Sequence, residues 1–291
     1  MSGINSVGWE EGACRGTQLR AEHAMRQHGT PGLVPFSTSD TRGSGDSETV
    51  LIDTRAARLR RMKSGVMTAA RLICGELDQT AERWRPWMIT PTYRPGEVWK
   101  PTHITALVKC FRAWAERQGF RLRYVWVAEI QQRRYRAGAI PGECVHYHLL
   151  IWLPARLSPP KPDKQGWWTH GFTQRLRVNR PLRYILKYTS KGDSVEFPKG
   201  LRIHGCGGLS REQRNERTWW LLPRWVRTLW AADQRPRRAV GGGFVVRDTG
   251  DWYPSIYEVC NTGGSILCSI KEGLFEWFSL QQLAQIFCDG L

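Results

Sequence analysis

An apolar run that contains two histidines, CVHYHLLIWLP at residues 144–154, is the segment that most constrains this chain of 291 residues. Its branched and aromatic residues favour a β-strand. Because side chains alternate between the faces of a strand, Val145 and Tyr147 point into a core, whereas His146 and His148 share the other face. Two adjacent imidazoles that lose water without gaining a partner cost free energy, and a shared divalent cation would remove that cost. The segment therefore predicts a core strand that carries a metal site.

A carboxylate completes this candidate site. The β-rich segment RLRYVWVAEI at residues 121–130 places Glu129 at its end, and an antiparallel pairing with the histidine strand could set Glu129 opposite the imidazoles. Two imidazoles and one carboxylate leave coordination positions open, as catalytic Mg²⁺, Mn²⁺ or Zn²⁺ sites require. The alternative is an H-x-H pair that arises by chance on a strand whose histidines face solvent.

A second motif, YILKYTSK at residues 184–191, repeats Y-x-x-K twice. On a helix, these two tyrosines and two lysines form one stripe, where an amphipathic helix normally carries leucine or isoleucine. A tyrosine oxygen can attack a DNA phosphate that a metal polarises, while lysine charge favours the phenolate or the developing negative charge. The alternative is a pair of half-buried tyrosines flanked by lysines whose ammonium groups reach solvent.

The segments MITPTY, VHYHLLIW and YILKYTSK, in this order, resemble the three motifs of rolling-circle replication initiators, the His-hydrophobe-His (HUH) endonucleases. The paired tyrosines resemble those of the two-tyrosine initiators of small single-stranded DNA phages. Downstream, GLRIHGCGGLS and LPRWV resemble segments of filamentous-phage replication proteins. The resemblance extends over about residues 85–260.

This resemblance implies an α+β fold of the ferredoxin or RRM type, with an antiparallel sheet of about five strands flanked by helices. It implies nicking of a single-stranded origin, which leaves a 5′-phosphotyrosine and a free 3′-OH that primes replication. A divalent cation, Mg²⁺ or Mn²⁺, would be held by His146, His148 and Glu129, of which Glu129 is assigned by position. Tyr188 would attack first and Tyr184 would accept the strand at termination, or Tyr184 is structural in a one-tyrosine mechanism. The expected catalytic residues are Tyr188, Tyr184, Lys187 and Lys191.

Charge points to the same partner. The chain has 43 Lys and Arg against 26 Asp and Glu, a net charge of +17. Residues 1–50 carry four Arg and six Asp or Glu, which leaves +19 on residues 51–291. Mixed with 15 Trp, 8 Tyr and 9 Phe, these cations are typical of grooves that bind single-stranded nucleic acid, although a Trp-rich core with a solvated basic face gives the same composition. We expect phosphate contacts from Arg133, Arg134, Arg136, Arg175, Arg177, Arg180 and Arg183.

Composition and periodicity divide the chain into four parts. We expect a disordered polar segment at 1–50, a leading helix at 51–84 with a possible break at Gly65, an endonuclease domain at 85–260, and an extension of unassigned role at 261–291. Within the domain we expect a strand at 86–96, helices at 101–119 and 180–193, paired strands at 121–130 and 144–153 joined by a long basic connection, and a helix around 215–234 interrupted at Pro223.

Several classes of protein are disfavoured. Eight scattered cysteines without a C-x-x-C pair argue against a thiolate zinc site and a disulfide framework, and suit the reducing cytoplasm of a bacterial host, with a phage or prophage gene. No apolar window is long enough to predict a membrane span. No Walker A motif is present, so unwinding would need a host helicase. Two rivals stay open: a single-tyrosine HUH transposase or relaxase, and a non-catalytic module that stacks single-stranded nucleic acid on its aromatic rings.

Overall fold

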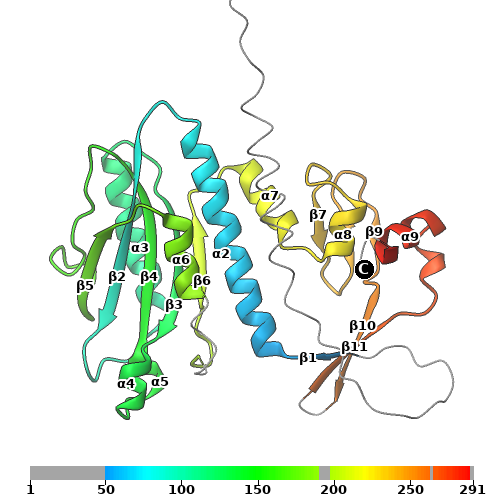
Figure 1. Ribbon diagram of the computed structural model, residues 1–291, viewed down its shortest axis with the longest axis horizontal. Helices are drawn as coiled ribbons and strands as arrows, with labels where there is room; N and C mark the ends of the chain where they lie inside the picture. Colours follow the sequence, from blue (N-terminus) through cyan, green and yellow to red (C-terminus); the bar gives the residue numbers. More distant parts are fainter. Residues whose placement is uncertain (1–49, 190–196, 263–264, 289–291) are drawn as a thin grey trace, which may run out of the picture. The chain divides into compact units, whose positions relative to one another are not determined.

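The computed structural model describes residues 50–189, 197–262 and 265–288 (Figure 1). The chain divides into two units, Met1–Val50 and Leu51–Leu291, and the elements that position the candidate site all lie in the second. The segment expected to be disordered, 1–50, lies outside the described residues except for Val50.

A five-stranded antiparallel sheet forms the centre of the second unit (Figure 1). In spatial order its strands are β5 (Gly171–Arg177), β2 (Trp84–Tyr93), β4 (Val145–Pro154), β3 (Arg123–Ile130) and β6 (His204–Gly207). The histidine strand β4 is the middle strand, and all ten of its residues are buried. A strand covered on both faces reads as a continuous apolar run, which is why β4 lacks a polar alternation. The predicted α+β class with about five antiparallel strands is confirmed.

Helices cover both faces of this sheet. Helices α2 (Thr54–Asp78) and α6 (Pro181–Thr189) pack on the face that carries the histidines, where α2 contacts β3 and β6 and α6 contacts β3 and β4. Helix α3 (Pro101–Arg117) lies on the opposite face (Figure 1). There the hydroxyl of Tyr93 lies 3.0 Å from Nδ1 of His103 on α3. The sheet therefore has one face for the candidate site and one for the main apolar core.

The leading helix is unbroken at Gly65, contrary to expectation. Asp53 caps it by accepting a hydrogen bond from the Ala56 amide at 2.9 Å, and the helix runs through Gly65. Gly65 is buried, and a Cβ added there would lie 3.0 Å from Nη2 of Arg217. The glycine serves close packing and does not mark a helix end. The helix ends at Asp78 instead of residue 84, and strand β2 already begins at Trp84.

The connection expected to be a long basic loop between β3 and β4 is partly helical. It contains the short helices α4 (Gln132–Arg136) and α5 (Pro141–Cys144). Downstream, α7 (Arg211–Trp220) and α8 (Arg224–Leu229) are separated at Pro223, as the sequence predicts. Strand β5 was not expected as a particular segment, although the family resemblance implied a fifth strand.

The C-terminal part has a small core of its own, built on Trp225, Val226, Phe244 and Phe278. Two three-stranded sheets, of order β7-β8-β9 and β1-β11-β10, belong to this part of the chain. Within the described residues, none of the helices combines the length and apolar character needed to cross a membrane. The remaining elements are β1 (Val50–Ile52), β7 (Pro236–Arg238), β8 (Phe244–Val246), β9 (Trp252–Tyr253), β10 (Tyr257–Thr262), β11 (Ser265–Ile270), the 3-10 helix η1 (Leu274–Glu276) and α9 (Leu280–Cys288).

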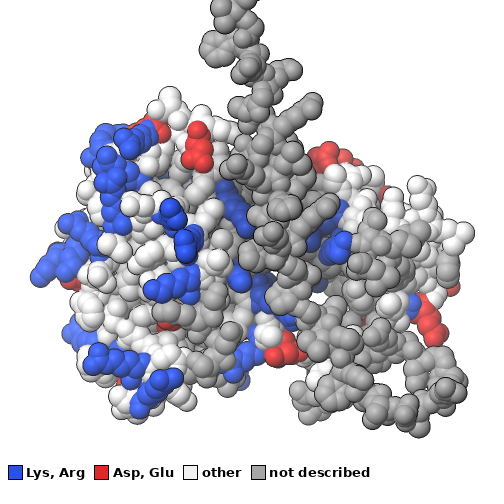
Figure 2. Space-filling view, in the orientation of Figure 1, with Lys and Arg blue, Asp and Glu red and all other residues white. Residues whose placement is uncertain are grey.

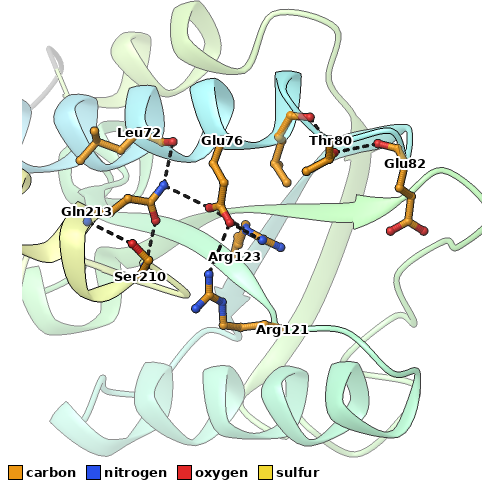
Figure 3. A network of polar contacts seen from close by, with 9 residues as sticks. Leu72, Glu76, Thr80, Glu82, Arg121, Arg123, Ser210 and Gln213 are labelled. Carbon is orange, nitrogen blue, oxygen red and sulfur yellow. Dashed lines mark hydrogen bonds and ion pairs between the residues drawn. The ribbon is translucent and has the colours of Figure 1, made fainter.

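One polar network ties α2 to the sheet and to α7 (Figure 3). The Glu76 carboxylate accepts two hydrogen bonds from Arg123, at 3.1 Å from Nε and 2.5 Å from Nη2. Gln213 of α7 donates to the same carboxylate at 3.1 Å and to the Leu72 carbonyl at 3.0 Å. The hydrogen bond from Arg123 lowers the pKa of Glu76 below its usual value of 4.5, against the opposing effect of burial. A two-point Arg–carboxylate pair of this kind sets both distance and orientation.

We expect Glu76→Gln to lower the free energy of unfolding by about 2 kcal/mol at pH 7, because the nearly buried Arg123 guanidinium loses its counter-charge. Because the folded-state pKa of Glu76 is depressed, its contribution is present above about pH 4.5 and is lost as pH falls through the folded-state pKa. Thermal melts of both proteins between pH 7 and pH 3 should therefore converge at low pH. Glu82→Gln, which removes the exposed ion pair to Arg156, is the matched control and should change little. A gap between Glu76→Gln and the parent that stays constant with pH would contradict this explanation.

Candidate metal centre and tyrosine helix

The pairing of β3 with β4 brings three metal-ligating side chains together. Glu129 stands directly opposite His146 in the antiparallel register, and Val127 stands opposite His148. Oε2 of Glu129 lies 3.0 Å from Nε2 of His146 and 2.7 Å from Nε2 of His148. The two Nε2 atoms are 3.1 Å apart. The predicted register of Glu129 is confirmed, and the three residues form a group that can hold a metal ion.

The chemistry of this donor set fits a divalent cation. Burial alone would raise the pKa of Glu129, but hydrogen bonds with His146 and His148 hold it well below its usual range, so the carboxylate is charged. Two imidazole nitrogens that face each other and one carboxylate oxygen cannot satisfy all of their hydrogen-bonding capacity pairwise, whereas a cation accepts all three lone pairs. Nδ1 of His148 lies 3.4 Å from the Thr90 hydroxyl, which can orient that ring. Nδ1 of His146 is buried and has no partner among the described residues.

The tyrosine helix α6 lies directly over this centre. The Tyr188 ring stacks on the His148 ring, with centroids 3.5 Å apart and an interplanar angle of 20°. The Tyr184 ring follows at 5.5 Å from that of Tyr188. Nζ of Lys187 lies 6.0 Å from the centroid of the Tyr188 ring. The structure thus brings both tyrosines and Lys187 to the metal centre, whereas Lys191 lies outside the described residues.

The environment of Tyr188 keeps its phenol protonated at neutral pH. Burial raises the pKa of Tyr188 above its usual value of 10, and the neighbouring Tyr184 raises it further. A phenol in this state is a weak nucleophile, and it becomes a strong one when its proton is removed or when positive charge is placed beside its oxygen. The ligand group next to Tyr188 can hold such a charge.

The predicted phosphate-binding arginines do not all lie at this centre. Arg133 lines a cavity of about 490 Å³ together with Glu129 and His146. Arg134 donates hydrogen bonds to the carbonyls of Tyr93 and Arg94 at 3.0 and 3.4 Å, so it fixes the end of β2. Three others are exposed on α4 or around the start of α6: Arg136, Arg180 and Arg183.

Arg175 and Arg177 lie on the other face of the sheet. In the β2–β5 register they pair with Ile89 and Trp87, which alternate with the residues that face the histidines. The guanidinium of Arg175 donates to the Pro159 carbonyl. The structure therefore does not bring these two arginines to the metal centre.

Sequence reasoning missed an exposed apolar strip on the face of the metal ligands. Phe172 pairs with Thr92, and Thr92 pairs with His146, so the three residues form one row across the sheet. The Phe172 side chain is 59% exposed, and Leu176, on the same face of β5, is 46% exposed. The alternation in GFTQRLR carried a strand signal, but the face on which Phe172 lies depends on the register with β2.

Comparison with known proteins adds one match. Residues 86–193 match the family model of the replication-associated protein ORF2. No curated protein and no solved structure is similar enough to this chain to count as a match. The matched region contains the metal-ligand group and the tyrosine helix. The match supports a phage replication initiator, with a role in DNA replication and an endonuclease-like activity in general.

Proposed function

We propose that this chain nicks and rejoins a single DNA strand at a replication origin through Tyr188, with a divalent cation held by Glu129, His146 and His148. The stacking of the Tyr188 ring on His148 carries this proposal, because it sets a nucleophile directly beside a metal ligand. A purely structural tyrosine has no need of a metal-ligand group beneath its ring. The match of residues 86–193 to a replication-associated family supports the same function.

In the proposed reaction, the Tyr188 oxygen forms a bond to phosphorus and the bond from phosphorus to the 3′ oxygen breaks. The phenol proton is released and the departing 3′ oxygen takes up a proton, which leaves a 5′-phosphotyrosine and a free 3′-OH. A bound divalent cation would act as a Lewis acid toward the scissile phosphate. Lys187, close to the Tyr188 ring, adds positive charge that favours the phenolate.

Tyr184 is placed to act second. It lies on the same side of α6 as Tyr188, one helical turn away, and its ring is 5.5 Å from that of Tyr188. After one round of replication, its oxygen can attack the regenerated origin while Tyr188 still holds the first 5′ end. Closure of the circle then reverses the first bond. In a one-tyrosine mechanism, Tyr184 would instead only pack against Tyr188.

The single strand is proposed to cross the open edge of the face that carries the metal ligands. Exposed Phe172 offers a ring on which an unpaired base can stack, and Arg133 lines the cavity beside His146. On the face drawn in Figure 2, basic side chains are spread over the part that holds the five-stranded sheet, and acidic ones are few. The sequence has no Walker A motif, so a host helicase would separate the strands.

Tyr188→Phe should abolish the covalent adduct between the protein and a labelled single-stranded origin, because phenylalanine keeps the ring packing and removes the attacking oxygen. Tyr184→Phe should still nick and form the adduct but should fail to release closed circles. Denaturing gels of the adduct, before and after protease, measure the first effect, and product topology measures the second. An undiminished adduct from the double variant would place the nucleophile elsewhere.

Replacing the ligand group should remove metal binding and nicking together. We expect His146→Ala with His148→Ala, and separately Glu129→Gln, to lose Mn²⁺ binding in calorimetry and to lose nicking in Mn²⁺-supplemented buffer. His170→Gln removes an imidazole outside the site and should change neither quantity. Chelator-treated parent protein should behave like the variants. Retained Mn²⁺ affinity in both variants, with circular dichroism showing intact folds, would contradict the proposed ligands.

The two groups of predicted DNA-binding arginines can be separated by salt dependence. Arg133→Gln with Arg183→Gln should weaken binding of single-stranded origin DNA and reduce the slope of log affinity against log salt by about 1.4, the value for two lost phosphate contacts. Arg175→Gln with Arg177→Gln removes the same charge from the opposite face and should change the slope less. Fluorescence anisotropy over a range of about 50 to 300 mM salt measures both. The reverse ranking would move the DNA path to the face covered by α3.

A further inference from the structure

A second basic site lies beside the edge strand β6. A cavity of about 810 Å³ is lined by residues of α2, β6, α7 and the β7–β8 region, and none of the described residues that line it is Asp or Glu. Nine of its lining residues are arginines: Arg58, Arg61, Arg202, Arg211, Arg214, Arg217, Arg235, Arg237 and Arg247. Such a concentration of like charge is electrostatically unfavourable in the isolated protein, so it points to an anionic ligand.

The chain itself neutralises little of this charge. In the described part of the structure, the ion pair that these arginines make is the one between Arg235 and Asp248, at 3.2 Å. Several of the other guanidinium groups are held by neutral acceptors. Arg217 donates to the Gly65 carbonyl and Arg237 to Oδ1 of Asn215, at 3.1 and 2.6 Å. These bonds orient the guanidinium groups and leave their charge available.

The response of His204 reports this positive field. Burial and the neighbouring Arg217, Arg202, Arg58 and Arg61 lower the pKa of His204 to about 4. Its Nδ1 atom is buried and lacks a hydrogen-bond partner among the described residues, as does Nε of Arg237. Groups at this wall of the cavity therefore have capacity that the described residues do not fill.

The lining also indicates which anion fits. No aromatic ring is among the described lining residues, so the cavity has no surface on which unpaired bases can stack. Arginine forks pair with phosphate oxygens in a two-point geometry. Nine cations contributed by four parts of the chain exceed what one free nucleotide can neutralise, and suit a run of phosphodiesters. A double helix presents such a run with its bases turned inward.

The cavity is separate from the metal centre but close to it. His204 pairs with Val127, and Val127 pairs with His148, so the two sites share one row across three strands. Two inter-strand spacings amount to about 10 Å between the backbones of His204 and His148. Helices α6 and α7 both pack against α2 and lie on opposite sides of it (Figure 1). Helix α2 thus separates the tyrosine helix from the arginine-lined cavity.

We propose that the arginine-lined cavity binds the phosphate backbone of double-helical DNA that adjoins the single strand at the metal centre. The idea rests on the proposed function for the identity of the DNA, and it adds a duplex-binding site to it. Recognition would be independent of base sequence, because guanidinium groups that contact phosphates do not read base edges.

The test uses the full chain with Arg61→Gln, Arg211→Gln and Arg247→Gln combined. These three side chains are exposed and make no hydrogen bond to other described residues, so their loss should leave the fold intact. The matched control combines Arg83→Gln, Lys109→Gln and Arg117→Gln, which removes the same charge from exposed positions outside the cavity. Anisotropy in chelator measures affinity for a duplex of about 20 base pairs of arbitrary sequence and for a single strand of the same length.

The cavity variant should bind the duplex about 10-fold or more weakly near physiological salt, with a salt slope reduced by about 2.7 for three lost contacts. Its affinity for the single strand should change less than about 2-fold, and the control should resemble the parent. Equal losses on duplex and single strand, or an equal loss in the control, would overturn the proposal. So would displacement of the duplex by equimolar tripolyphosphate, which would identify a small-polyphosphate site. Because binding is measured without nicking, its failure and that of the proposed nicking are seen separately.

Discussion

The register between β3 and β4 is the constraint on which the rest of the candidate site depends. It sets Glu129 opposite His146 and keeps both imidazoles on the face of α6. A slip by one residue would turn the imidazoles toward the apolar face that Tyr147 and Leu149 fill, and would expose those side chains to the polar one. Both faces of β4 are buried, so such a slip costs the burial of large side chains as well as the ligand group. The strength of the core and the geometry of the site are therefore the same property of one strand pair.

The helices on this face turn a ligand group into a site with a nucleophile. Ile185, fully buried, anchors α6 on the sheet, and this fixes the side of the helix from which Tyr188 meets His148. Helix α2 supports that position because it packs against both α6 and β3, and the Glu76–Arg123 pair holds it to β3. The same burial that positions the Tyr188 phenol also raises its pKa. The position thus supplies orientation, while reactivity has to come from charge brought to the site.

Sequence reasoning reached the parts of this site that local periodicity determines. Alternation along a strand placed His146 and His148 on one face, and antiparallel pairing was enough to add Glu129. Helical spacing put Tyr184 and Tyr188 together. It failed where the answer depends on contacts between distant segments. Gly65 looked like a helix break because its packing against Arg217 is 152 residues away. The face of Arg175 depends on the register of β5 with β2, and the arginine-lined cavity draws on segments from Arg58 to Arg247, none of which carries a motif of its own.

The two edges of the sheet offer different chemistry, and this difference gives the molecule a direction. At the β5 edge, exposed Phe172 and Leu176 share the face of the metal ligands, and such apolar surfaces suit bases that are unstacked and unpaired. At the β6 edge, guanidinium groups gather without rings, which suits a backbone whose bases are already paired. The metal centre on β3 and β4 lies between these edges. An enzyme that cuts at the boundary between a paired and an unpaired segment needs this order, because its nucleophile must meet the strand where pairing ends. The net charge of the chain is therefore best understood as divided between two sites with different tasks, of which only the one beside the histidines needs a tyrosine.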